Sequence, residues 1–195
     1  MGFNIEDGTG KGNSAGVDRT NRLLVRNISE SIFQNAAEEG DAFFIGSPIT
    51  DITTATELAV LYIKNEGDDA LVLGNFLFMA ESSTVAAPAF YQVSWYKNSG
   101  SMNNGTSFVP LNQNFGSSET LDGIFEFGNG TTSTKITTNL PVSTLSYPTE
   151  SPQDIPANLV LEKGSELLVT VTAPATNTAM NFYFGTRAIK YVEQY

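Results

Sequence analysis

The apolar pattern from residue 42 onward constrains the fold of this chain more than any other feature. Eight segments there are short, and are either apolar or strictly alternating, with turn-forming residues between them. These segments are residues 42–45, 56–64, 70–79, 90–97, 121–127, 157–161, 166–173 and 180–192. Such segments are typical of β-strands, and no long helical pattern lies between them, so we expect an all-β antiparallel sandwich. The number of strands favours a jelly-roll-like arrangement.

Finer features of three strands lead to further expectations. Residues 56–64 and 70–79 are joined by an acidic, glycine-containing turn at residues 66–69, which is typical of a hairpin loop. This turn lacks the ligand spacing of a calcium loop, so a solvated turn is the better interpretation. The long apolar runs of the two strands indicate that one or both are buried on two faces. Residues 166–173 alternate cleanly, which predicts one buried and one exposed face.

One short helix is expected before the first strand. Ser29 and Ser31 offer N-caps, an apolar stripe lies within residues 32–37, and Gly40 supplies a left-handed stop. We therefore divide the chain into residues 1–41, an extended N-terminal arm with a basic strand and the helix, and residues 42–195, the β-sandwich domain.

The arm contains two kinds of segment. Residues 1–18 are rich in glycine and polar side chains, so their apolar surface is too small to offset the entropy of ordering without a partner. Residues 19–27 carry three of the ten positive charges and form a plausible docking patch, although pairing with neighbouring carboxylates explains them equally well. The arm side chains that we expect to make contacts are Phe3, Ile5, Arg19, Arg22 and Arg26.

Composition excludes several classes of function. The chain has no His and no Cys, which removes imidazole bases, thiol nucleophiles, disulfides and nearly all zinc sites. Its net charge of −11 disfavours binding to nucleic acid. No stretch approaches the roughly 18 apolar residues that span a bilayer. We therefore expect no enzymatic activity, catalytic residue, metal or cofactor, and no nucleic-acid or membrane partner.

Two groups of residues suggest chemical sites despite this expectation. Residues 8–12 resemble a phosphate-binding loop, but they lack the Gly-Lys-Ser/Thr step and a preceding strand. Glu57, Glu126 and Glu166 could form the carboxylate pair of a glycosidase, but nothing in their spacing brings them together. A glycine-rich arm and solvated strand acids are the better interpretations.

Aromatic side chains in residues 90–97 allow a third reading. Tyr91, Trp95 and Tyr96 could form a platform that stacks on sugars. At least one face of such an aromatic-rich strand must belong to the core, so we favour core packing over sugar binding.

Two long connections interrupt the strands. Residues 98–118 contain no charged residue but carry Phe108, Leu111 and Phe115, and residues 128–156 are rich in threonine and proline. Loops of this length in a compact domain usually mean function, contact with another chain, or disorder. We expect contacts with other subunits, made by the three apolar side chains of the first loop.

Four short motifs of the chain are similar to those of one protein family. Residues 12–23 are similar to a glycine-rich arm followed by Val-Asp-x-x-Asn-Arg-Leu, and residues 38–43 to Glu-x-Gly-Asp-Ala-Phe. Residues 60–65 match Val-x-Tyr-x-Lys-Asn, and residues 161–167 resemble a Pro-x-Gly-Ser step before the penultimate strand. In this ordered set the chain resembles the capsid decoration or cement proteins among the virion structural proteins of tailed bacteriophages. The matches cover the first 75 residues or so and the last 40, and the middle of the chain has none.

The resemblance implies a non-enzymatic protein that is made in the host cytoplasm and sits on the capsid surface of the virion. Its expected partners are the major capsid protein and further copies of itself, as a trimer or dimer. The arm would then dock on the capsid, and the loop at residues 98–118 would contact the capsid or a neighbouring subunit. The alternative is a carbohydrate- or receptor-binding module of a phage fibre or tail.

Overall fold

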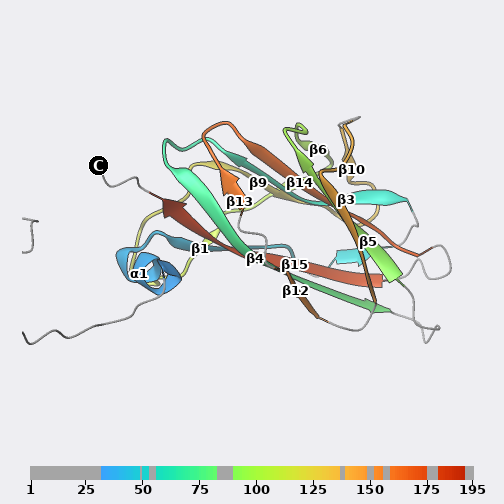
Figure 1. Ribbon diagram of the computed structural model, residues 1–195, viewed down its shortest axis with the longest axis horizontal. Coiled ribbons are helices and arrows are strands. Elements are labelled where there is room, and N and C mark those ends of the chain that lie inside the picture. The colour runs from blue at the N-terminus through green and yellow to red at the C-terminus, as the bar shows by residue number, and fades with distance from the viewer. Residues whose placement is uncertain are drawn as a thin grey trace, which may run out of the picture. The chain divides into compact units, whose positions relative to one another are not determined.

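The computed structural model describes residues 32–48, 50–52, 56–82, 90–136, 139–148, 152–155, 159–174 and 180–191. These residues form one helix and fifteen strands, most of them in two large antiparallel sheets (Figure 1). The predicted all-β antiparallel sandwich is therefore confirmed. Residues 1–31, which include the predicted contact residues Phe3, Ile5, Arg19, Arg22 and Arg26, lie outside the described residues.

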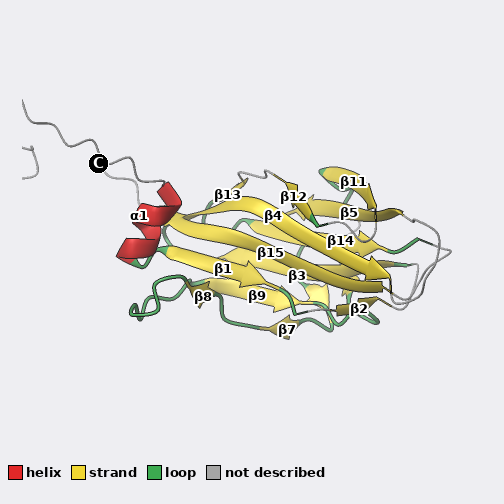
Figure 2. Ribbon diagram, turned by 90° about the horizontal axis from the view of Figure 1, so that it is seen from below, coloured by secondary structure: helices red, strands yellow, loops and turns green. Residues whose placement is uncertain are grey.

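The first sheet has the strand order β12-β4-β15-β1-β8, with β13 also paired to β4 and β2 also paired to β15. Its strands are β1 (Ala42–Gly46), β2 (Thr50–Ile52), β4 (Ala70–Ser82), β8 (Leu111–Asn112), β12 (Gln153–Ile155), β13 (Leu159–Leu161) and β15 (Met180–Tyr191). In Figure 2, β4, β15 and β1 lie side by side in this layer, with the helix at one end of it.

The second sheet has the strand order β11-β5-β14-β3-β9-β7. Its strands are β3 (Glu57–Asn65), β5 (Phe90–Lys97), β7 (Thr106–Ser107), β9 (Gly123–Phe127), β11 (Ser143–Pro148) and β14 (Glu166–Thr172). A separate small ribbon pairs β6 (Met102–Asn103) with β10 (Thr134–Lys135).

The pairing of the long strands is nested. β5 pairs with β11, β4 with β12 and β13, β3 with β14, and β1 with β15, so the chain folds back on itself as one long ribbon. Two further ladders, β15 with β4 and β14 with β5, roll this ribbon into the two sheets. Consecutive long strands therefore often lie in opposite sheets.

The predicted hairpin between the strands at 56–64 and 70–79 is wrong. β3 belongs to the second sheet and β4 to the first, so the turn at residues 66–69 crosses from one layer to the other. The buried Asn65 side chain holds this crossing, because its Nδ2 donates to the carbonyl oxygens of Asp69 (2.9 Å) and Leu161 (2.8 Å). A short acidic turn has the same sequence pattern whether it closes a hairpin or crosses between two sheets. The pairing of β3 with β14 and of β4 with β15 makes it a crossing.

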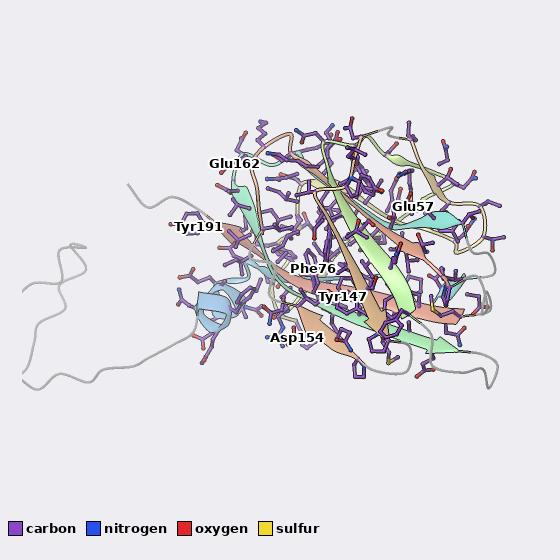
Figure 3. All side chains as sticks on the ribbon, turned by 45° about the vertical axis from the view of Figure 1, so that its right-hand side comes forward. Glu57, Phe76, Tyr147, Asp154, Glu162 and Tyr191 are labelled. Carbon is purple, nitrogen blue, oxygen red and sulfur yellow. The ribbon has the colours of Figure 1, made fainter. Side chains whose placement is uncertain are left out.

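The main core lies between the two sheets and is rich in aromatic rings. The ring of Phe184 lies 5.1 Å from that of Phe76 and 5.0 Å from that of Phe78, measured between centroids. Phe76 lies in the middle of the sandwich, with Tyr147 from β11 packed against the same cluster (Figure 3). Burial of these inward-facing side chains is the main force that holds the sheets together.

The outward face of the second sheet is also covered. Leu168 and Thr170 were predicted to face solvent, but both are buried, so the prediction of one exposed face for residues 166–173 is wrong. A second cluster forms on this face from Ala59, Tyr62, Tyr96, Met102 and Leu168. Met102 belongs to the small β6–β10 ribbon, which covers the sheet. β3 is therefore buried on both faces, as predicted, whereas β4 alternates.

The predicted helix is confirmed as α1 (Ile32–Glu39). Gly40 has a positive φ of 88°, and the amide of Asp41 donates to the carbonyl oxygen of Ala36 at 2.7 Å. Ala36 packs with Ala42 and Ile189, which joins the helix to β1 and β15. This packing stabilises a helix of eight residues that would be marginal alone.

Candidate functional site

Exposed apolar side chains gather in the segment between β7 and β9. Within residues 108–119, which we call the contact loop, Val109 is 76% exposed, Leu111 57% and Phe115 90%. The loop carries a single charged residue, Glu119, at its end. Single exposed hydrophobic residues are ordinary, whereas several in one nearly uncharged segment make it a candidate contact surface.

Two asparagine side chains fix the backbone of the contact loop. Nδ2 of Asn112 donates to the carbonyl oxygens of Gly40 (2.7 Å) and Glu119 (3.1 Å). Nδ2 of Asn114 donates to the carbonyl oxygen of Glu38 at 3.0 Å. The carbonyls of the last helical turn have no partner within the helix, so these amides satisfy groups at the end of α1 while anchoring the loop. The loop therefore presents its apolar side chains from a defined backbone.

The structure separates the predicted contact residues of this segment into two roles. The Phe108 ring is half-buried and lies 6.1 Å from the Phe125 ring and 5.8 Å from the Phe127 ring, so it fastens the loop to the protein's own domain. Leu111 and Phe115 are exposed and available for contacts. Val109 was missed by the sequence reasoning, although it lies in the same uncharged segment.

The three glutamates considered as a carboxylate site all lie on the outward face of the second sheet. Glu126 is paired across the strands with Tyr62, and Glu166 accepts a hydrogen bond of 2.7 Å from the amide of Gly100. Burial, followed by the charges of Glu166 and Glu126, raises the pKa of Tyr62 well above its usual range. The three carboxylates thus share one face of the sheet, which their spacing in the sequence did not reveal, but each has its own partners.

Glu57 is engaged in a polar cluster with Lys135, Tyr96 and Thr170. Its Oε2 lies 2.6 Å from Nζ of Lys135, and its Oε1 accepts hydrogen bonds from the hydroxyls of Tyr96 and Thr170, the latter at 2.7 Å. Nζ of Lys135 also donates to the Tyr96 hydroxyl at 2.7 Å. Burial raises the pKa of Glu57, but the hydrogen bonds and the charge of Lys135 together lower it below its ordinary value.

This cluster acts as a clamp. Lys135 comes from β10, whereas Glu57, Tyr96 and Thr170 come from three strands of the second sheet, so the ion pair ties the small ribbon to the sheet. A carboxylate that is held ionised by an ammonium group is a poor general acid. Among the described residues, no group of three or more Asp or Glu side chains converges to hold a metal ion.

The aromatic residues considered as a sugar platform are buried. Tyr91 and Trp95 face the core between the sheets, and Tyr96 lies in the outer cluster beneath Lys135, whose Nζ is 4.4 Å from the ring centroid. None of the three presents an open ring face to solvent, so core packing, the favoured interpretation, holds for this strand.

Comparison of the chain with models of protein families, with curated proteins and with solved structures finds no match. In the part of the chain that the structure describes, no helix combines the length and apolar character needed to cross a membrane.

Proposed function

We propose that this chain is a non-enzymatic virion structural protein that binds the outside of a bacteriophage capsid and stabilises it as a decoration or cement protein. The observation that carries the proposal is the contact loop, an ordered and nearly uncharged segment with Val109, Leu111 and Phe115 exposed. The sequence motifs that resemble tailed-phage decoration proteins point in the same direction.

We also propose that the sandwich is a jelly roll. The support is the nested pairing, which gives the order β1-β15-β4-β12/β13 in one sheet and β3-β14-β5-β11 in the other. A ribbon that is folded at its middle and rolled in this way places each half of the chain in both sheets, as two interlocked Greek keys do.

A contact loop of this kind suits a partner that is present in many copies on one capsid shell. Burying one leucine or phenylalanine side chain contributes about 1.5–3 kcal/mol, so a few such residues give only a weak single contact. When several copies are linked, as in the trimer or dimer that we propose, the weak contacts act together. The low charge of the loop also limits repulsion from an acidic shell, which matters for a chain with a net charge of −11.

Co-sedimentation with capsids tests the proposal. Capsids of the phage that encodes this chain, assembled without it, would be mixed with the purified protein or with the double variant L111D/F115D. We expect the native protein to sediment with the capsids and the variant to stay in solution. Failure of the native protein to bind would overturn the proposal.

The matched control is the double variant F90D/I136D. Phe90 and Ile136 are also exposed apolar residues, but they belong to β5 and to the segment after β10. The control should bind as the native protein does, and thermal unfolding should show that both variants remain folded. Equal binding by L111D/F115D would remove the contact loop from the mechanism.

A further inference from the structure

A cavity of about 470 Å³ lies at the edge of the sandwich, where β11 and β13 form the borders of the two sheets. We call it the edge cavity. Its walls are mainly apolar and include Phe76, Trp95, Leu145, Ile155, Leu159 and Val160. The volume falls within the range of roughly 300–1,000 Å³ that is usual for sites of small molecules. The contact loop takes no part in it.

The inner wall of the edge cavity is aromatic. The Trp95 and Phe76 rings are stacked with centroids 6.1 Å apart, and the Trp95 side chain is almost fully buried. Its indole N–H is buried and has no hydrogen-bond partner among the described residues. Buried indole N–H groups usually have a partner, so this wall combines apolar surface with one unmatched donor.

The lining also includes charged side chains of both signs. Lys97 and Glu162 are exposed residues of the lining, and Glu162 lies at the outside of the molecule in Figure 3. Glu166 also belongs to the lining, but its carboxylate lies on the outward face of the second sheet, where it accepts the hydrogen bond from Gly100. Lys97 and Glu162 together leave the lining with no net charge, so it offers no charge complementarity to an anionic ligand group. Burying a cationic group would carry a desolvation cost.

We propose that the edge cavity binds an uncharged aliphatic amphiphile, with its hydrocarbon chain against Phe76, Leu145 and Leu159 and its polar head among the charged residues of the lining. Removal of the chain from water drives the binding, since the lining is mostly apolar. The ligand class is that of long-chain alcohols and monoacylglycerols. This site is independent of the capsid contact, because the contact loop is formed by other residues.

The single tryptophan of the chain makes the test direct, since Trp95 itself lines the cavity. Decanol, decanoate and decyltrimethylammonium would be titrated separately into the full-length protein below their aggregation concentrations. Binding would be followed by Trp95 emission and by native mass spectrometry. We expect a saturable change and a one-to-one adduct with decanol, and binding at least about tenfold weaker for both charged probes. Absence of both signals with decanol overturns the site, and equal or tighter binding of either charged probe overturns the uncharged head.

Variants locate the binding. Val142 and Val160 both line the cavity and are exposed, so V142D and V160D should fold normally while weakening decanol binding at least about tenfold. V109D makes the same change at an exposed position in the contact loop and should bind decanol as the native protein does. Undiminished binding by both cavity variants would overturn the assignment. L111D/F115D should retain decanol binding, which separates failure of this site from failure of the capsid contact.

Discussion

The side-chain amide of Asn114 donates a hydrogen bond of 3.0 Å to the carbonyl oxygen of Glu38, a residue 76 positions earlier in the chain. With the similar bond from Asn112 to Gly40, it fastens the contact loop to the end of α1. A long-range contact thus holds a segment whose sequence is typical of a flexible loop. The exposure of Phe115 is therefore a property of an ordered surface.

Replacement of Asn114 by alanine should loosen the contact loop. The change removes the bond to Glu38 and leaves a helix-end carbonyl without its partner, which costs about 1 kcal/mol of unfolding free energy. Hydrogen exchange followed by mass spectrometry should show faster exchange in residues 113–119. The control is N103A, since the Asn103 side chain makes an exposed bond of 3.3 Å to Thr134, outside the contact loop. Unchanged exchange in N114A would show that the loop is held in another way.

The Glu57–Lys135 clamp should make stability depend on pH in the acidic range. The pKa of Glu57 in the folded protein lies below its ordinary value of 4.5, so the folded state favours the ionised carboxylate. This contribution is fully present above pH 4.5 and is lost as the pH falls through the lower folded pKa. Urea unfolding of the native protein should therefore show a loss over this range that is smaller in E57Q.

The control for this pH dependence is E81Q, which removes an exposed carboxylate at the end of β4. Its curve of unfolding free energy against pH should run closer to that of the native protein than the E57Q curve does. K135M leaves the partly buried Glu57 without its ammonium partner and should cost roughly 1–3 kcal/mol near neutral pH. Equal acid sensitivity of the native protein and E57Q would contradict the role of the clamp.

Elements that depend on residues close together in the sequence could be predicted from apolar patterns and turn residues. The strand at residues 90–97 is predicted with its observed bounds, and Gly40 ends α1 with the expected left-handed conformation. The strands β11 and β12 were missed inside a predicted long connection. β11 has the exposed pattern of an edge strand, rich in serine and threonine; Tyr147 packs against the core, and Ser143 and Leu145 line the edge cavity. A strand that is held mainly by hydrogen bonds to its neighbour needs little alternation of apolar and polar residues, so its sequence does not reveal it.

The contact loop could be predicted only in part, because its composition is visible in the sequence whereas its contacts with distant residues are not. The lack of charge in residues 98–118 singles out the segment, since composition is visible without a structure. The different environments of Phe108 and Phe115 depend on Phe125 and Phe127, which follow later in the chain. The placing of Glu57, Glu126 and Glu166 on one face likewise depends on the order of strands in the second sheet, which no spacing in the sequence specifies.

Gly128 should tolerate no side chain. A Cβ at this position would lie 1.8 Å from the carbonyl oxygen of Ala59, a backbone atom of β3 that cannot rotate away. G128A should therefore lose roughly 2–4 kcal/mol of unfolding free energy in urea titrations, through strain and displaced backbone. The matched control is G116A, where the nearest atom is the Asn114 Oδ1 at 3.4 Å, and its loss should be well below half as large. Similar stability of the two variants would show that the approach to Ala59 is looser than described.

Two phenylalanines allow the same substitution to distinguish the core from the contact loop. Phe184 is fully buried among Phe76 and Phe78, so F184L leaves a space in the core and should cost about 1–3 kcal/mol of unfolding free energy. Phe115 is 90% exposed, so F115L should change the stability of the isolated chain by less than about 0.5 kcal/mol. Equilibrium unfolding of both variants at several protein concentrations checks this difference. A loss in F115L that grows with protein concentration would mean that a second copy covers Phe115, which would turn the contact loop from a capsid surface into the interface between subunits.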